Sequence, residues 1–123
     1  MKTILYIEDN PVNVYLVQAI FAPRRDVRLV IAPTGTRGLE IVKQDRPDLI
    51  LLDLNLPDMP GDGFMRQLRA DEANAALPVI AISGDSLQEQ RNRMQDLAVA
   101  EFIPKPFDLD EFERVVNRYL DPD

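Results

Sequence analysis

Five short apolar segments, each followed by a helix-length stretch of mixed polarity, constrain the fold of this 123-residue chain more than any other feature of its sequence. The segments lie near residues 3–8, 27–31, 48–53, 78–82 and 101–104. Runs that are apolar at consecutive positions are typical of strands buried on both faces of a parallel sheet. Parallel strands that alternate with helices are joined by right-handed crossovers. The sequence therefore predicts an α/β fold, with one five-stranded parallel sheet and helices on both faces, in a single domain spanning residues 1–123.

Each of the five intervening stretches is expected to form a helix. The predicted helices start at Pro11, cover about 34–45, start near Gly61, cover roughly 86–97 and cover about 108–120. The first has Asn10 as its N-cap and Pro11 at the first helical position, where no backbone N–H is needed. The last has Asp108 as its N-cap and Glu111 at the spacing of a capping box. The fourth carries few apolar residues, so we expect it to be anchored least firmly to the sheet.

The composition excludes several classes of function. The chain has no cysteine and no histidine, which rules out disulfides, Cys or His metal sites and Ser–His or Cys–His nucleophile pairs. Any metal must be bound by oxygen atoms, which favours Mg²⁺, Mn²⁺ or Ca²⁺. An excess of 21 acids over 14 bases gives a net charge of −7, so direct nucleic-acid binding is not expected. No apolar stretch has the length of a bilayer span and Met1–Thr3 shows no signal-peptide pattern, so we expect a soluble, cytoplasmic protein without membrane association.

Polar residues lie where four of the predicted strands end. They are Glu8, Asp9, Asp53, Ser83 and Lys105. The carboxyl ends of parallel strands meet at one edge of the sheet, where ligand sites form in open α/β folds. Three acids crowded together repel one another and need a cation. Phosphoryl transfer to a carboxylate requires such a set, namely a carboxylate nucleophile, acids for a divalent cation, a hydroxyl donor and a fixed positive charge.

Four short motifs contain these residues. They are Ile7–Asn10, Leu52–Pro57 with Gly61, Ile82–Gly84 and Phe102–Pro106. In this order and at this spacing, the chain resembles over essentially its whole length the receiver domain of two-component response regulators, including the chemotaxis regulators. The resemblance implies a doubly wound, flavodoxin-like (βα)5 fold with strand order 2-1-3-4-5.

The resemblance also implies the chemistry of the site. Asp53 would be the phosphoacceptor, taking a phosphoryl group from a phosphohistidine on a sensor histidine kinase or a histidine phosphotransfer protein. Mg²⁺ would be held by Asp9 and Asp53, by Glu8 through water, and by the backbone carbonyl of Asn55. The phosphorylated domain would then signal to a downstream effector domain or protein. The domain would promote its own phosphorylation and dephosphorylation but would not act as an enzyme on other substrates.

Further positions match the family in the second half of the chain. Ser83 and Lys105 would bind the phosphoryl oxygens, and Gly84 would leave room for the group. Ser83 and Phe102 would form the switch, in which the aromatic side chain changes rotamer on phosphorylation. Asp85 is expected to tune the lifetime of the phosphorylated state, because an acid near the phosphoryl group can orient or repel the attacking water.

Three local features follow from comparison with the family pattern. The Lys105–Pro106 peptide bond is expected to be cis. Glu8 stands where Asp is commoner, so a longer side chain must reach the metal. Ala98 stands where a helix-ending Gly is typical, and a left-handed backbone there would cost Ala about 1 kcal/mol.

Two other functions are compatible with parts of the pattern. A Mg²⁺-dependent phosphohydrolase with an aspartyl-phosphate intermediate, like the haloacid dehalogenases, has its nucleophile after the first strand and a second Asp two residues later. Here the acceptor follows the third strand and position 55 is Asn. A flavodoxin-like FMN module needs a Ser/Thr-rich phosphate loop after the first strand, where Glu8–Pro11 would repel phosphate. With no effector domain, the chain is expected to be a stand-alone regulator or a piece of a larger protein such as a hybrid kinase.

Overall fold

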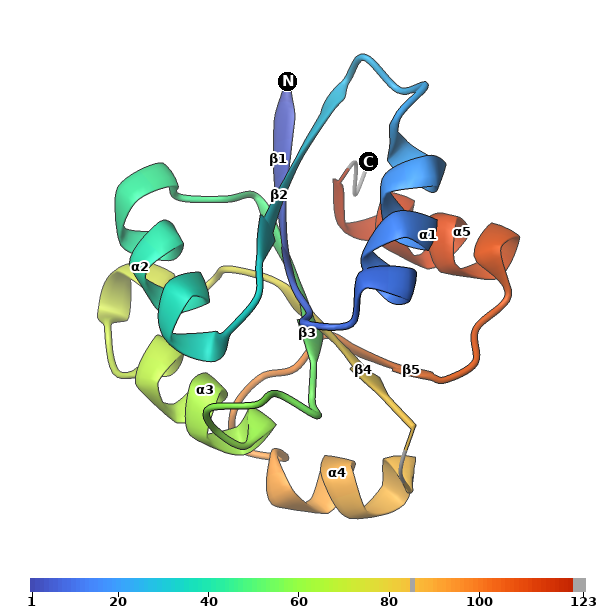
Figure 1. Cartoon of the computed structure of the whole chain (residues 1–123). Coiled ribbons are helices and arrows are strands. Elements are labelled where there is room, and N and C mark those ends of the chain that lie inside the picture. Colours follow the sequence, from blue (N-terminus) through green and yellow to red (C-terminus); the bar gives the residue numbers. More distant parts are fainter. Residues whose placement is uncertain (85, 121–123) are drawn as a thin grey trace.

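Five parallel strands form one sheet at the centre of the molecule (Figure 1). The computed structural model describes residues 1–84 and 86–120, so the prediction for Asp85 lies outside the described residues. The strands are β1 (Lys2–Ile7), β2 (Val27–Ala32), β3 (Leu49–Asp53), β4 (Val79–Ser83) and β5 (Glu101–Pro104). Their order in the sheet is β2-β1-β3-β4-β5, and every pairing is parallel. The predicted fold class and strand order are confirmed.

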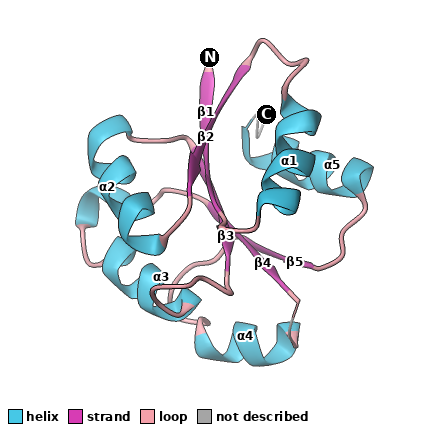
Figure 2. Cartoon of the chain, in the orientation of Figure 1, coloured by secondary structure: helices cyan, strands magenta, loops and turns pink. Residues whose placement is uncertain are grey.

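Helices cover both faces of this sheet (Figure 2). They are α1 (Pro11–Phe21), α2 (Gly35–Asp45), α3 (Gly61–Arg69), α4 (Leu87–Arg93) and α5 (Leu109–Leu120), with a short 3-10 turn, η1 (Glu72–Asn74), between α3 and β4. Side chains of α1 and α5 pack on one face, and those of α2, α3 and the turn after α4 pack on the other. Within the described ranges, no helix has both the length and the hydropathy to cross a membrane.

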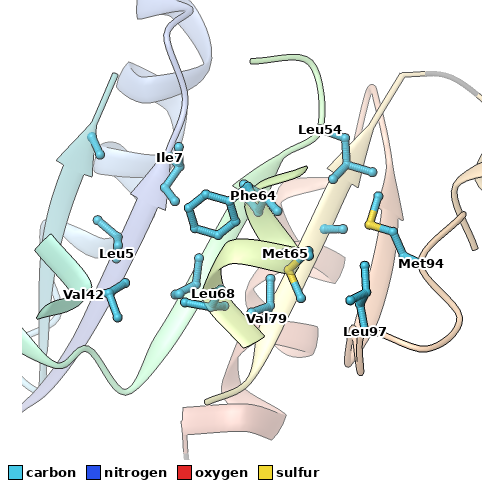
Figure 3. Packing of buried hydrophobic residues seen from close by; sticks show 14 of the residues in the cluster. Leu5, Ile7, Val42, Leu54, Phe64, Met65, Leu68, Val79, Met94 and Leu97 are labelled. Atoms are coloured by element: carbon cyan, nitrogen blue, oxygen red, sulfur yellow. The ribbon is translucent and has the colours of Figure 1, made fainter. Parts of the chain in front are cut away.

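The strands are apolar at consecutive positions because both of their faces are buried. In β1, Leu5 and Ile7 pack under α2 and α3, whereas Ile4 and Tyr6 pack under α1 and α5. Figure 3 shows the first of these clusters, in which the Phe64 ring lies beside Ile7. All of these side chains have no exposed surface. Burying a side chain of this size contributes about 1.5–3 kcal/mol, so the two layers hold the sheet edge in a fixed position.

The predicted helix caps are present at both ends of the chain. The Asn10 side chain accepts hydrogen bonds from two backbone amides of α1, and Pro11 is the first helical residue. At α5 the Asp108 carboxylate accepts from two amides of the first turn, at 2.9 and 3.1 Å. The Glu111 carboxylate, which stands at the spacing of a capping box, forms an ion pair with Arg114 of the same helix.

The fourth helix is shorter than the predicted range of 86–97, because α4 ends at Arg93. The chain then forms a turn in which the Leu97 amide donates to the carbonyl of Met94, and both side chains are buried. Ala98 has the left-handed backbone (φ 55°) that the missing glycine implied. The guanidinium of Arg69 donates to the carbonyls of Leu97 (3.0 Å) and Ala98 (2.9 Å), which satisfies two backbone acceptors at the end of this turn.

Candidate functional site

The acidic residues that follow β1 and β3 meet at the carboxyl edge of the sheet. Ile7 of β1 lies opposite Leu52 of β3, so the next residues along both strands, Glu8 and Asp53, are level with each other. Carboxylate oxygens of Glu8, Asp9 and Asp53 lie within 4.8 Å of one another. Glu8 is 1% exposed and Asp53 2% exposed, whereas Asp9 is open to solvent. The three predicted acids therefore form one cluster. A cation could reach it from the solvent on the side where Asp9 is exposed.

A lysine from the next part of the edge neutralises this cluster in part. The Lys105 amide donates to the carbonyl of Ser83, which ties the end of β5 to the end of β4. The Lys105 Nζ lies 2.9 Å from Asp53 Oδ2 and 3.5 Å from Glu8 Oε1. Its peptide bond to Pro106 is cis, as the family resemblance implied. The predicted lysine thus contacts the predicted phosphoacceptor directly.

Burial and proximity divide the charge unequally between the two buried acids. Burial raises the pKa of Glu8, and the neighbouring Asp53 raises it further. Burial also acts to raise the pKa of Asp53, but hydrogen bonds with Glu8, the Asn55 amide and Lys105 outweigh burial and lower it. For Lys105, burial is outweighed by Asp53 and Glu8, so its pKa is raised. Of these two acids, Asp53 is therefore the one whose surroundings favour the ionised form, which is the form that can act as a nucleophile.

Two residues that contact Glu8 were not predicted from the sequence. The Tyr6 hydroxyl donates to Glu8 Oε1 at 3.1 Å, and the Asn13 side-chain amide donates to the same oxygen at 3.1 Å. Tyr6 lies two residues before Glu8 on β1, and residues at this spacing in a strand share a face. Asn13 lies in the first turn of α1, three residues after the Asn10 cap. The Tyr6 hydroxyl was a usable signal, because a strand this deeply buried otherwise carries apolar side chains, whereas a polar residue at a half-buried helical position such as Asn13 gives no such signal.

The loop after Asp53 is held from two directions. The Asn55 amide donates to Asp53 Oδ1 at 2.9 Å, which fixes the first turn of the loop. Further along, the Asp58 carboxylate accepts from the backbone amides of Gly35 and Thr36 at the start of α2, both at 2.9 Å. These partners lie 22 and 23 residues from Asp58, and no local pattern in the sequence indicated the contact.

A glycine closes this loop. A Cβ atom added at Gly61 would come within 2.5 Å of Leu54 Cδ2 and 3.2 Å of the Leu54 Cα. Any larger residue at this position would force Leu54 to shift, which accounts for Gly61 in the motif.

Comparison with known proteins identifies this arrangement. Over residues 4–117 the chain matches the response regulator receiver domain family. The chain belongs to this family. Among curated relatives of this receiver domain is the polar-differentiation response regulator DivK of Brucella anthropi, which is 26% identical over 119 residues, with 97% of this chain and 96% of the relative covered.

Solved structures resemble the receiver domain over its whole length. The receiver domain of the sensor histidine kinase PA1611 from Pseudomonas aeruginosa is 29% identical, with a TM-score of 0.85 and 97% of each chain covered; in that protein a magnesium ion is coordinated in the active site cleft. The chemotaxis response regulator CheY4 of Vibrio cholerae is 20% identical, with a TM-score of 0.88 and 98% and 99% of the two chains covered, and supports the fold.

The remaining predicted residues of the receiver domain lie on β4 and β5. Ser83 is 3% exposed at the end of β4. Among the described residues, a Cβ atom added at Gly84 would meet Lys105 Cβ alone, at an ordinary contact distance of 3.9 Å. Phe102 is half-buried on β5, and the Arg91 guanidinium of α4 lies 5.6 Å from its ring centroid. Ser83 and Gly84 therefore lie beside Lys105 at the same edge of the sheet, whereas Phe102 of β5 contacts Arg91 of α4.

The donor set of this receiver domain suits a hard divalent cation. The clustered acids offer only carboxylate oxygens, which are the ligands that Mg²⁺ prefers, and Mg²⁺ sites in proteins retain several waters. Such a cation would supply positive charge next to the ionised Asp53 carboxylate. Together with Lys105, the site can stabilise negative charge that develops on a group transferred to Asp53.

Proposed function

We propose that Asp53 accepts a phosphoryl group from a phosphohistidine on a sensor histidine kinase or a histidine phosphotransfer protein. The observation that carries this proposal is the position of the buried Asp53 carboxylate between Lys105 Nζ at 2.9 Å and two further acids. In the transfer, a bond forms between an Asp53 oxygen and phosphorus while the bond between phosphorus and the histidine nitrogen breaks. The histidine keeps the electron pair and takes up a proton.

We assign the other site residues to positioning and charge neutralisation. Glu8, Asp9, Asp53 and the backbone carbonyl of Asn55 would hold Mg²⁺, which supplies charge neutralisation for the transferred oxygens. The Lys105 ammonium would bind one phosphoryl oxygen, and the Ser83 hydroxyl would bind another. Gly84, which has no side chain, would leave room for the group.

The product of this chemistry is a signal. We propose that residues 1–123 form a single receiver domain that promotes its own phosphorylation and dephosphorylation and acts on a downstream effector domain or protein, in the cytoplasm, where kinases make phosphohistidine from ATP. The net charge of −7 argues against direct binding to nucleic acid.

The proposal is tested by intact mass spectrometry after incubation with acetyl phosphate and Mg²⁺. The protein is expected to gain the mass of one phosphoryl group. A parallel sample with EDTA should gain none or gain it far more slowly, because the acids then lack the cation. Failure to gain mass over hours with Mg²⁺, or equal labelling in EDTA, would overturn the proposed chemistry.

Removal of Asp9 is expected to abolish measurable Mg²⁺ binding while preserving or raising the thermal stability of the metal-free protein. Asp9 is an exposed member of a cluster of like charges, so Asp9→Ala removes a ligand and relieves repulsion at the same time. Calorimetric titration with Mg²⁺ and thermal melts in EDTA measure the two effects. Asp96→Ala, which removes an exposed acid beyond α4, is the control and should change neither. Equal Mg²⁺ affinity in Asp9→Ala and wild type would show that the metal binds elsewhere.

We propose that the output is read on the face formed by α4, β5 and α5. The α4 helix has only seven residues, and the Arg91 guanidinium rests on the Phe102 ring at 5.6 Å. New contacts from the phosphoryl group to Ser83 and Lys105 would draw Phe102 inward, away from Arg91. The beryllofluoride complex, a phosphoryl mimic, is therefore expected to shift the NMR resonances of residues 86–106.

Two comparisons make the output experiment decisive. Asp53→Asn cannot form the beryllofluoride adduct and should show no shifts. In the wild type, changes confined to the loops around Asp53, with residues 86–106 unaltered, would contradict the proposed output face.

A further inference from the structure

The Glu8 carboxylate is held by a set of donors concentrated on one of its two oxygens. Oε1 accepts from the Tyr6 hydroxyl at 3.1 Å, from the Asn13 side-chain amide at 3.1 Å and from Lys105 Nζ at 3.5 Å. Oε2 accepts one longer bond, from the Asn10 backbone amide at 3.4 Å, among the N–H and O–H groups of the described residues. Apart from the hydrogen bond that Glu8 shares with Asp53, three donors contact Oε1 and one contacts Oε2, so Oε2 is the oxygen more available to a cation.

Among the described residues, Glu8 is the only hydrogen-bond partner of the Tyr6 hydroxyl. Tyr6 has no exposed surface, and its ring packs with the apolar residues under α1 and α5. A phenylalanine ring fills the same volume without placing a hydroxyl in the core. A buried hydroxyl without a partner costs about 1–3 kcal/mol, and Glu8 is the partner of this one.

Asn13 approaches the same oxygen from α1. Its backbone amide donates to the Asn10 cap, while its side-chain amide reaches Glu8. Two rigid elements, β1 and the first turn of α1, therefore fix the same carboxylate from different directions. A glutamate has one more rotatable bond than an aspartate, so its carboxylate needs such fixation to present a defined oxygen to a cation.

We propose that Tyr6 and Asn13 are positioning residues that hold Glu8 with Oε2 directed to the cation between Glu8, Asp9 and Asp53. This inference rests on the proposed function of these acids as the Mg²⁺ site. Residues that orient a metal ligand through a hydrogen bond change metal affinity by about 10–100-fold when they are replaced. Tyr6→Phe is expected to weaken Mg²⁺ binding about 10-fold, at the lower end of that range, because Asn13 and Lys105 remain.

The test is a double-mutant cycle on the Mg²⁺ dissociation constant, measured by NMR titration of backbone amide resonances. The variants are Tyr6→Phe, Asn13→Ala, Glu8→Ala and the double variant Tyr6→Phe/Glu8→Ala. Tyr6→Phe should weaken binding in the wild-type background and have no effect in the Glu8→Ala background, because Tyr6 acts through Glu8. An equal loss in both backgrounds would assign Tyr6 a general structural role and overturn the proposal.

A matched control is available on the other side of the molecule. The Tyr119 hydroxyl also donates to a glutamate, Glu101 Oε2, at 3.0 Å, at a site remote from the acid cluster. Tyr119→Phe should leave the Mg²⁺ dissociation constant unchanged. If Tyr6→Phe fails to fold, Asn13→Ala decides the question, since alanine is compatible with α1 and the Asn10 cap remains.

The outcomes separate this inference from the proposed function. Absence of Mg²⁺ binding by the wild type would refute the metal site itself. Mg²⁺ binding that depends on Glu8 but is unchanged in both Tyr6→Phe and Asn13→Ala would preserve the metal site and overturn the positioning role.

Discussion

Asp53→Asn is expected to gain no phosphoryl mass from acetyl phosphate and Mg²⁺ under conditions that label the wild type fully. The amide of Asn lacks the negative charge and the free carboxylate oxygen that attack phosphorus. The substitution keeps the size of the side chain, and its carbonyl oxygen can still accept from the Asn55 amide. Loss of labelling therefore reports lost chemistry at one atom, and intact mass spectrometry measures it directly.

Asp58→Asn, the same change at an acid five residues after Asp53, provides the control. Asp58 lies in the loop that follows Asp53, but its carboxylate binds the start of α2 and is not a member of the acid cluster. Asp58→Asn should be labelled to the same final extent as the wild type. A phosphoryl group on Asp53→Asn would place the acceptor at another residue and remove the basis of the proposed function.

The sheet was predictable because its signal is local and repeated. β1 and β3 are apolar at consecutive positions since helices cover both faces, and this pattern survives in the sequence without knowledge of any contact. The edge where Glu8, Asp53 and Lys105 meet then follows from topology, because parallel strands end at the same side. The order of the strands and the cis bond before Pro106 came from the family resemblance and not from the residues.

The end of α4 was not predictable from its own segment. Met94 and Leu97 occur at helical spacing, so the pattern extended the helix to residue 97. The structure uses both as core residues but places them in a turn after α4, and Arg69 of α3 donates to the carbonyls of Leu97 and Ala98 at the end of that turn. These contacts join residues 28 and 29 positions apart, beyond the reach of a helical pattern.

The roles of Tyr6 and Asp58 were missed for different reasons. Tyr6 fits the apolar pattern of a buried strand. Only its hydroxyl, two residues before Glu8, distinguishes it from the apolar residues of that strand. Asp58 reads as a turn residue, and its bond to α2 depends on how two loops approach each other at the sheet edge. The first contact could be found from strand geometry, whereas the second required the tertiary structure.

Lys105→Met is expected to destabilise the metal-free protein by about 2 kcal/mol at pH 8. Lys105 is the cation that faces Glu8 and Asp53, and removing one partner of a fully buried pair costs about 3–5 kcal/mol. We expect a smaller cost because the Lys105 side chain keeps 23% of its surface exposed, so water and ions screen the charges. Urea denaturation in EDTA measures the free energy of unfolding.

The loss should depend on pH in a defined direction. The pKa of Asp53 is lowered in the folded protein, in part by Lys105, so this carboxylate contributes stability above its unfolded pKa of about 3.9 that is lost as pH falls through the folded pKa. Without Lys105 that contribution shrinks. Lys105 also acts to lower the pKa of Glu8, which burial raises to about 7, so the gap between Lys105→Met and the wild type should be widest near pH 8 and narrow as Glu8 takes up a proton below about pH 7. It should narrow again only below about pH 4, where Asp53 is protonated. Lys43→Met, an exposed lysine of α2, should change stability by less than about 0.5 kcal/mol.

Mg²⁺ distinguishes this electrostatic loss from a packing defect. In Lys105→Met the acids have lost their only contacting lysine among the described residues, so saturating Mg²⁺ should recover most of the lost stability and should bind at least as tightly as to the wild type. Phosphorylation should nevertheless fail, because no ammonium then binds the transferred oxygens. Asp9→Ala is predicted to do the opposite to the metal-free protein, preserving or raising its stability while losing the cation. If both substitutions destabilise the metal-free protein alike and Mg²⁺ rescues neither, like-charge repulsion does not govern this edge of the sheet.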